Sequence, residues 1–178
     1  MVFTVRGTKK FLDRVGRPVA DPLPPSSTVL GDWYGNVLFW RPQVAVFVNA
    51  STFVPVLMPL APSMSVLDRF PAAMAEVFAT LGIDPRFVAS ETSAMQSAVL
   101  AKTASRQVLG VMNEFVFMAE HAIDAGRCDA HDLIGLSVWL ADTIVGPISK
   151  DDGYTPLGAL QRLVAVTLED DAGSWPRE

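Results

Sequence analysis

The sequence predicts a single α+β domain, in which a small and mainly antiparallel β-sheet packs against about five or six helices. Three observations lead to this fold class. The length of 178 residues suits one domain. Hydrophobic residues make up 50% of the chain and charged residues 19%, which is enough apolar material for a sizeable core. Short runs of β-branched and aromatic residues fill the first third, and helical periodicity follows them.

The N-terminal segment predicts a strand, a helix and a loop. Val2–Val5 alternates weakly and predicts a short strand. Thr8 is a suitable N-cap for a helix over Lys9–Val15, which Gly16 would end. Asp21–Ser27 is rich in proline and serine and predicts a loop.

A three-strand antiparallel meander is predicted next. Its strands are the runs Asn36–Arg41, Gln43–Asn49 and Phe53–Met58. The short polar segments between them suit hairpin connections. Pro55 cannot donate a hydrogen bond to a neighbouring strand, so the third strand should lie at an edge or a bulge.

The period of the apolar residues then changes to that of a helix. Phe70–Leu81 carries a single apolar stripe, and Gly82 follows as a C-cap. The other predicted elements are a helix from Asp84 to about Met95, a strand at Ala98–Thr103, a helix from Ser105 to about Ala125, a helix opened by Asp129 or Asp132 and stopped by Gly146-Pro147, and a helix from Thr155 to roughly Leu168. Residues 1–168 are thus expected to form the domain. Residues 169–178 are expected to form an acidic, flexible C-terminal tail.

The charge is unevenly distributed. The formal net charge is −5, yet residues 1–17 hold five basic residues and one acidic residue, a local excess of +4 (5 − 1). This basic end could attract a phosphate or an acidic partner surface, or it could be a solvated helix face. The overall negative charge makes nucleic acid an unfavourable partner.

The cysteine content and the length of the apolar runs indicate the cellular compartment. Cys128 is the only cysteine, which excludes an internal disulfide and favours a reducing cytoplasm. The longest apolar run, Phe53–Pro62, is too short to span a bilayer, and the basic N-terminus lacks the apolar segment of a secretory signal. We therefore expect no membrane association. The sequence also lacks a phosphate-binding loop, a dinucleotide fingerprint and a common zinc spacing, so we expect neither a cofactor nor a metal.

The stretch AKTASRQVLGVMNEF, residues 101–115, is the first candidate for a binding site. Lys102 and Thr103 lead into the N-terminus of a helix on which Arg106, Gly110 and Asn113 share one face. A cation at this end of a helix is unfavourable unless an anion offsets it, which indicates an anion site. Alternatively, Arg106 pairs with an acid such as Asp32, and Gly110 lets the helix sit close to the sheet.

The stretch LGDWYGN, residues 30–36, is the second candidate. Its glycines favour a turn just before the first meander strand. Trp33 and Tyr34 could stack on a ring or anchor a partner, and Asp32 and Asn36 are the polar candidates. The alternative is a turn whose aromatic side chains cover the end of the sheet.

These two stretches, with Thr8-Lys9-Lys10 and Phe47-Val48-Asn49, resemble a bacterial family catalogued as domain of unknown function 6933. The resemblance extends over nearly the whole chain. The family pattern has a serine where this sequence has Gln107, which weakens any role for a hydroxyl there. The resemblance implies no activity and no catalytic residue.

Particular residues support two hypotheses for the function, whereas a third, a role inside a larger bacterial assembly, has no support beyond small size and an acidic pI. The first is a non-catalytic binding or protein-interaction module, with a protein partner or a second copy bound near Trp33, Tyr34 and Trp40. The second is a small enzyme or effector that acts on a phosphorylated or nucleotide-like substrate. In the second hypothesis, the anion would be held by Lys10, Lys102 and Arg106. Asn113 would orient it, and Asp32 would act as a base or a metal ligand. Both hypotheses require the two stretches to meet in space.

Overall fold

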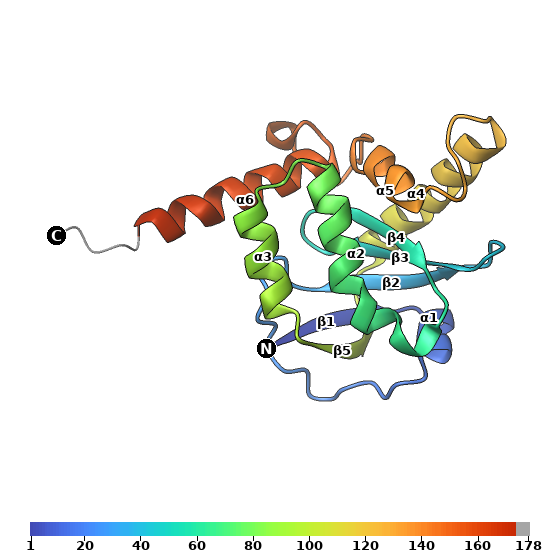
Figure 1. The fold of residues 1–178 in the computed structure, drawn as a ribbon, viewed down its shortest axis with the longest axis horizontal. Coiled ribbons are helices and arrows are strands. Elements are labelled where there is room, and N and C mark those ends of the chain that lie inside the picture. Colours follow the sequence, from blue (N-terminus) through green and yellow to red (C-terminus); the bar gives the residue numbers. More distant parts are fainter. Residues whose placement is uncertain (174–178) are drawn as a thin grey trace.

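The computed structural model describes residues 1–173, and over this range five strands form one mixed sheet in the order β4-β3-β2-β1-β5 (Figure 1). The strands are β1 (Val2–Gly7), β2 (Trp33–Leu38), β3 (Val44–Asn49), β4 (Pro55–Pro59) and β5 (Ser97–Lys102). The strands β2, β3 and β4 form the predicted antiparallel meander. The strand β1 pairs in parallel with both β2 and β5, so the sheet is mixed rather than mainly antiparallel.

The two parallel pairs follow from the connections between their strands. A hairpin turn joins antiparallel strands, whereas parallel strands need a longer crossover. The segment from β1 to β2 contains the helix α1 (Lys9–Val15) and the predicted loop, and the return to β5 passes through two further helices. These pairings join segments far apart in the sequence, where the local pattern carries no information about partners.

Helices cover both faces of the sheet (Figure 1). They are α1, α2 (Val66–Thr80), α3 (Pro85–Ala94), α4 (Arg106–Asp124), α5 (Leu133–Ala141) and α6 (Pro156–Gly173). On one face, Phe70 of α2 lies 4.1 Å, between ring centroids, from Phe47 of β3. On the other face, Phe115 of α4 belongs to a core cluster with Tyr34 of β2. The α+β class is confirmed.

The first meander strand begins earlier than expected. Trp33 and Tyr34 lie inside β2, which runs from Trp33 to Leu38 rather than from Asn36 to Arg41. Only Gly31 of this stretch has a positive φ, +68°, so the turn ends before Trp33. Gly35 serves a different purpose, because a Cβ there would come within 3.0 Å of the Phe11 ring. The glycines thus mark one turn and one site of close packing.

Local sequence signals predicted both ends of α1 and the start of α5, but not the end of α5. Thr8 caps α1 by accepting a hydrogen bond from the Phe11 N–H, and Gly16 closes this helix in the left-handed conformation. Asp132, rather than Asp129, is the N-cap of α5. This helix ends at Ala141, well before Gly146.

The C-terminal helix is longer than predicted. The helix α6 runs to Gly173, so the acidic residues 169–171 lie within a helix rather than in a tail. Its side chains Leu160 and Val164 are buried in the core. Residues 174–178 of the expected tail lie outside the described residues.

Candidate functional site

The two candidate stretches meet at the parallel strands through Arg6 of β1. The Arg6 Nε donates a hydrogen bond to Asp32 Oδ2 at 2.6 Å, and its Nη1 donates to the Lys102 carbonyl at 3.2 Å. The strand β1 lies between β2 and β5, which brings the two segments together. The alternative in which Arg106 pairs with Asp32 is wrong, because Asp32 is the ion-pair partner of Arg6.

Asn36 holds the start of α1 against β2. Its Oδ1 accepts a hydrogen bond from Thr8 Oγ1 at 2.7 Å and another from the Val37 N–H at 2.9 Å. Thr8 is the N-cap of α1. The polar atoms of Asn36 and Thr8 thus have a structural role in joining helix and strand.

Trp33 and Tyr34 are buried rather than displayed. Trp33 is 0% exposed and packs edge-on against Phe70, with 4.9 Å between ring centroids. Tyr34 is 3% exposed and belongs to the core on the other face of the sheet. In the described part of the chain, the Trp33 Nε1 has no hydrogen-bond partner. Both rings support the core, and neither presents a free face for stacking.

Arg106, Gly110 and Asn113 lie on the exposed side of α4. The close approach to the sheet at Gly110 is absent, because no described atom outside the local helix backbone lies within 4 Å of the position that a Cβ would take. Within residues 1–173, the side chains of Arg106 and Asn113 make no hydrogen bond or ion pair. This part of the motif is therefore a solvent-facing helix surface.

Lys102 and Thr103 line an open hollow of about 670 Å³, which we call the anion hollow. Arg6 lines it as well, and residues 19–23 form its other side. The Lys102 ammonium has no ion-pair partner in the described range, whereas Arg6 is held by Asp32. Arg106 and Asn113 do not line the hollow, so the sequence-based set of site residues is split between two places.

The basic side chains of residues 1–17 largely find their partners within the chain. Lys9 pairs with Asp13 at 2.7 Å and Arg17 with Asp68 at 2.8 Å. Lys10 lies 5.4 Å from the centroid of the Phe39 ring. These contacts favour the interpretation of a solvated, internally paired surface for these residues.

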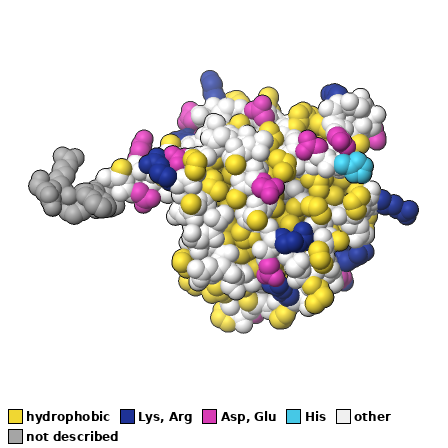
Figure 2. Space-filling model, in the orientation of Figure 1, with side chains coloured by type: hydrophobic (Ala, Val, Ile, Leu, Met, Phe, Trp, Pro, Cys, Tyr) yellow, Lys and Arg dark blue, Asp and Glu magenta, His cyan; other side chains and the backbone are white. Residues whose placement is uncertain are grey.

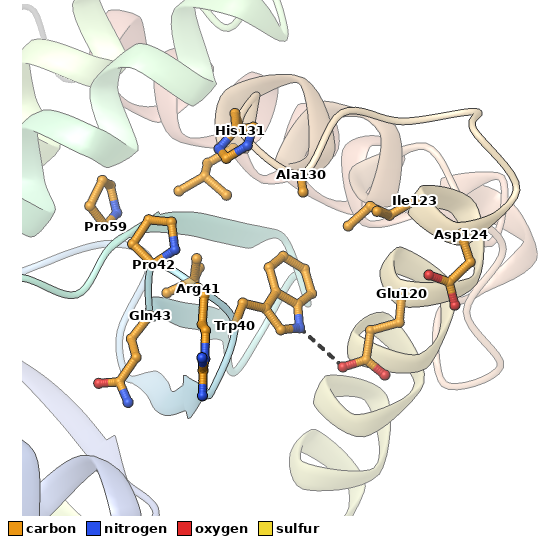
Figure 3. Close-up of a pocket in the computed structure, with 12 residues that line it drawn as sticks. Trp40, Arg41, Pro42, Gln43, Pro59, Glu120, Ile123, Asp124, Ala130 and His131 are labelled. Carbon is orange, nitrogen blue, oxygen red and sulfur yellow. Dashed lines mark hydrogen bonds between the residues drawn. The ribbon is translucent and has the colours of Figure 1, made fainter.

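A second cavity, of about 440 Å³, lies beside the β2–β3 hairpin and was not predicted (Figure 3). We call it the hairpin pocket. Its apolar lining is Trp40, Pro42, Val44, Pro59, Ile123, Ala130 and Leu133, and its polar lining is Arg41, Gln43, Glu120, Asp124 and His131. The lining comes from the hairpin, from the end of α4 and from the connection between α4 and α5. Pro59 of β4 and Leu133 of α5 complete the lining, so segments far apart in the sequence converge on this pocket.

A hydrogen bond fixes the orientation of the indole in the hairpin pocket. The Trp40 Nε1 donates to Glu120 Oε1 at 3.0 Å, which ties the hairpin to α4 (Figure 3). Glu120 and Asp124 are one helical turn apart and share a side of α4. Neither carboxylate belongs to an ion pair among the residues that the structure describes. The pocket therefore combines an apolar wall with two carboxylates that form no ion pair within the described residues.

The sequence holds a weak signal for this pocket. Trp40, next to an Arg-Pro-Gln connection, is an aromatic residue in a turn, and such a residue can mark a surface site. Its partner Glu120 lies 80 residues away along the chain. No local pattern links the two positions, so the pocket could not be derived without the fold.

Among the groups with a shifted pKa, Glu91 is the most buried, at 2% exposure. Burial raises the pKa of its carboxyl above the usual 4.5, and hydrogen bonds from the Val29 and Leu30 N–H groups partly offset this effect. Those two amides belong to the turn before β2. Glu91 thus anchors the turn to α3.

Two further features concern metal ions and membranes. Within residues 1–173, no group of three or more His, Cys, Asp or Glu side chains is placed to hold a metal ion. No helix in that range has both the length and the apolar character needed to cross a membrane.

Comparison with known proteins gives one match. A family model described as domain of unknown function (DUF6933) matches residues 4–156. The matched range contains every residue that lines the anion hollow and the hairpin pocket. No curated protein and no solved structure matches the chain.

Proposed function

The chain belongs to the DUF6933 family, and we propose that it acts as a non-catalytic binding module in the bacterial cytoplasm, with its ligand site in the hairpin pocket. The observation that carries this proposal is the concave, mostly apolar cavity with a few convergent polar groups, which is the usual form of a ligand site. Its volume of about 440 Å³ suits a small molecule or one or two side chains of a partner. The single cysteine favours the reducing compartment.

The state of Trp40 supports the same proposal. A buried aromatic surface contributes strongly to binding, and the cost of binding falls when the ring is already ordered. The hydrogen bond to Glu120 holds the indole in place before any ligand arrives. Ile123 and Leu133 supply aliphatic surface in the same cavity. A ligand with an apolar body would therefore gain contact area at little conformational cost.

A matched set of small probes tests this function. We would add 3-phenylpropylamine, 3-phenylpropanol and 3-phenylpropionate separately to ¹⁵N-labelled protein and follow the indole N–H signals of its four tryptophans by NMR. The proposal predicts a saturable shift of the Trp40 signal with at least one probe. Concentrations of about 10 mM would reveal even millimolar affinities. An unchanged Trp40 signal with all three probes would contradict the proposal.

A second candidate function is favoured by the anion hollow. Lys102 and Arg6 bring two cations and Thr103 a hydroxyl to one open cavity, and such groups bind phosphate. Under this alternative, the chain is a small enzyme or effector that acts on a phosphorylated or nucleotide-like substrate. Asp32 is a poor base in this arrangement, because its carboxylate is already engaged by Arg6. The alternative therefore rests on binding of the anion rather than on an identified catalytic group.

Thermal shift measurements test the alternative. Inorganic phosphate, ATP and glucose 6-phosphate should each be added to the wild type, to Lys102→Ala and to Lys150→Ala, an exposed lysine outside the hollow. The alternative predicts a rise in Tm that Lys102→Ala abolishes and Lys150→Ala keeps. Equal responses in all three proteins would assign the effect to non-specific charge and exclude the hollow.

A further inference from the structure

A smaller cavity of about 240 Å³ lies next to the hairpin pocket, along the edge strand β4. Pro59, His131 and Leu133 line both cavities, so the two are adjacent, and we call the pair the edge groove. Ala73 and Glu76 of α2 line the far side of the smaller cavity. Figure 2 shows hydrophobic side chains gathered over the end of β4, with acidic side chains and a histidine along their upper border.

Carboxylates are present in both compartments of the edge groove. Glu120 and Asp124 line the hairpin pocket, and Glu76 and Asp132 line the smaller cavity. None of the four belongs to an ion pair in the described part of the chain. Arg41 is the only arginine or lysine in either lining. The groove thus presents negative charge around apolar walls at two successive places.

The edge of β4 does not favour strand addition as a mode of binding. Pro55 and Pro59 have no N–H to donate, and the Leu57 N–H already donates to Ser137 Oγ at 2.8 Å. A peptide that adds a strand to a sheet relies on such backbone groups. Recognition in the edge groove must therefore come from side chains, through apolar contact and charge.

We propose that the edge groove binds an extended peptide segment of a partner protein, in which basic side chains flank an apolar one; this inference rests on the proposed binding function. Lysine and arginine suit the groove because their aliphatic stems cover apolar walls while their charged ends reach carboxylates. The apolar side chain enters between Trp40 and Ile123. A small amine would fill only one compartment, whereas a peptide engages both pairs of carboxylates.

Fluorescence anisotropy with labelled peptides tests the proposal. The probes are a fluorescein-labelled peptide of alternating lysine and leucine and its counterpart of alternating glutamate and leucine. The proteins are wild type, Glu120→Gln, Glu76→Gln and Glu114→Gln, an exposed carboxylate of α4 that lines neither cavity. We expect the basic peptide to bind wild type and Glu114→Gln equally. Glu120→Gln and Glu76→Gln should each weaken binding by about 3- to 10-fold.

Three results would overturn the inference, and they are distinguishable from failure of the proposed function. The first is equal or tighter binding of the acidic peptide. The second is a loss of affinity in Glu120→Gln but not in Glu76→Gln, which would confine the ligand to the hairpin pocket and leave the binding function intact. The third is self-association in size-exclusion chromatography that Glu76→Gln abolishes, which would make a second copy the occupant. A Trp40 signal that responds to none of the small probes would instead contradict the binding function itself.

Discussion

Gly110 is a helical glycine with open space where its side chain would be. Glycine inside a helix is less favourable than alanine by about 1 kcal/mol. No described atom outside the local helix backbone lies within 4 Å of the Cβ that alanine would add. We therefore expect Gly110→Ala to raise the free energy of unfolding by about 1 kcal/mol, measured by urea denaturation.

Gly158 of α6 provides the matched control for this prediction. A Cβ at Gly158 would collide with the Asp152 carbonyl oxygen, so Gly158→Ala should destabilise the protein. A destabilising effect of Gly110→Ala would contradict the open space at this point of α4.

Glu91 predicts a particular dependence of stability on pH. Its pKa is raised in the folded state, so the folded protein binds the proton more tightly than the unfolded chain does. The contribution of Glu91 to stability is therefore fully present below the unfolded pKa, near 4.5, and is lost as pH rises through the folded pKa. The unfolding free energy of wild type minus that of Glu91→Gln should fall as pH rises from 4.5. A difference that grows with pH would contradict the raised pKa.

Residue-scale features were predictable where their partners are near in sequence. Thr8 as a cap and Gly31 as a turn follow from positions within a few residues of each. The ion pair of Arg6 with Asp32 and the hydrogen bond of Trp40 with Glu120 join distant segments, and sequence analysis missed both. The position of Trp33 was wrong because glycines on both sides resemble a turn, whereas pairing with β1 extends the strand over it.

At the scale of elements, the helix α5 caps the free edge of β4 through a hydrogen bond. The edge position of β4 was predicted from Pro55 and is confirmed by the strand order. The Ser137 side chain accepts the Leu57 N–H and donates to the Leu133 carbonyl, so one serine joins helix and strand. A helix whose serine satisfies a distant strand could not be foreseen, because serine inside a helix usually bonds only its own backbone.

Ser137→Ala tests this hydrogen bond. The substitution leaves the Leu57 N–H buried without an acceptor, which costs about 1 to 3 kcal/mol of unfolding free energy. Ser137→Thr keeps the hydroxyl and serves as the conservative comparison. Urea denaturation should show the loss in Ser137→Ala, and hydrogen exchange at Leu57 should accelerate. An unchanged stability together with an unchanged exchange rate would mean that the bond contributes little.

At the scale of the whole molecule, the α+β class was predictable and the mixed sheet was not. Composition and the change of period fix the kinds of element, whereas the partners of β1 depend on contacts far apart in the sequence. The same distinction applies to the sites. The stretches chosen from the sequence do meet, through Arg6, but the mostly apolar hairpin pocket lies where the hairpin, α4 and α5 converge.

Binding in the hairpin pocket is the central claim, and NMR titrations of a variant with a filled pocket test it most directly, with the three phenylpropyl probes used in turn. Ala130→Leu places a larger side chain in the cavity lining, and Ala125→Leu makes the same change at an exposed position outside it. We predict a saturable shift of the Trp40 indole signal in wild type and Ala125→Leu, with affinity about tenfold weaker in Ala130→Leu. Equal titrations in all three proteins, or no saturable shift in the wild type with any of the three probes, would contradict the claim.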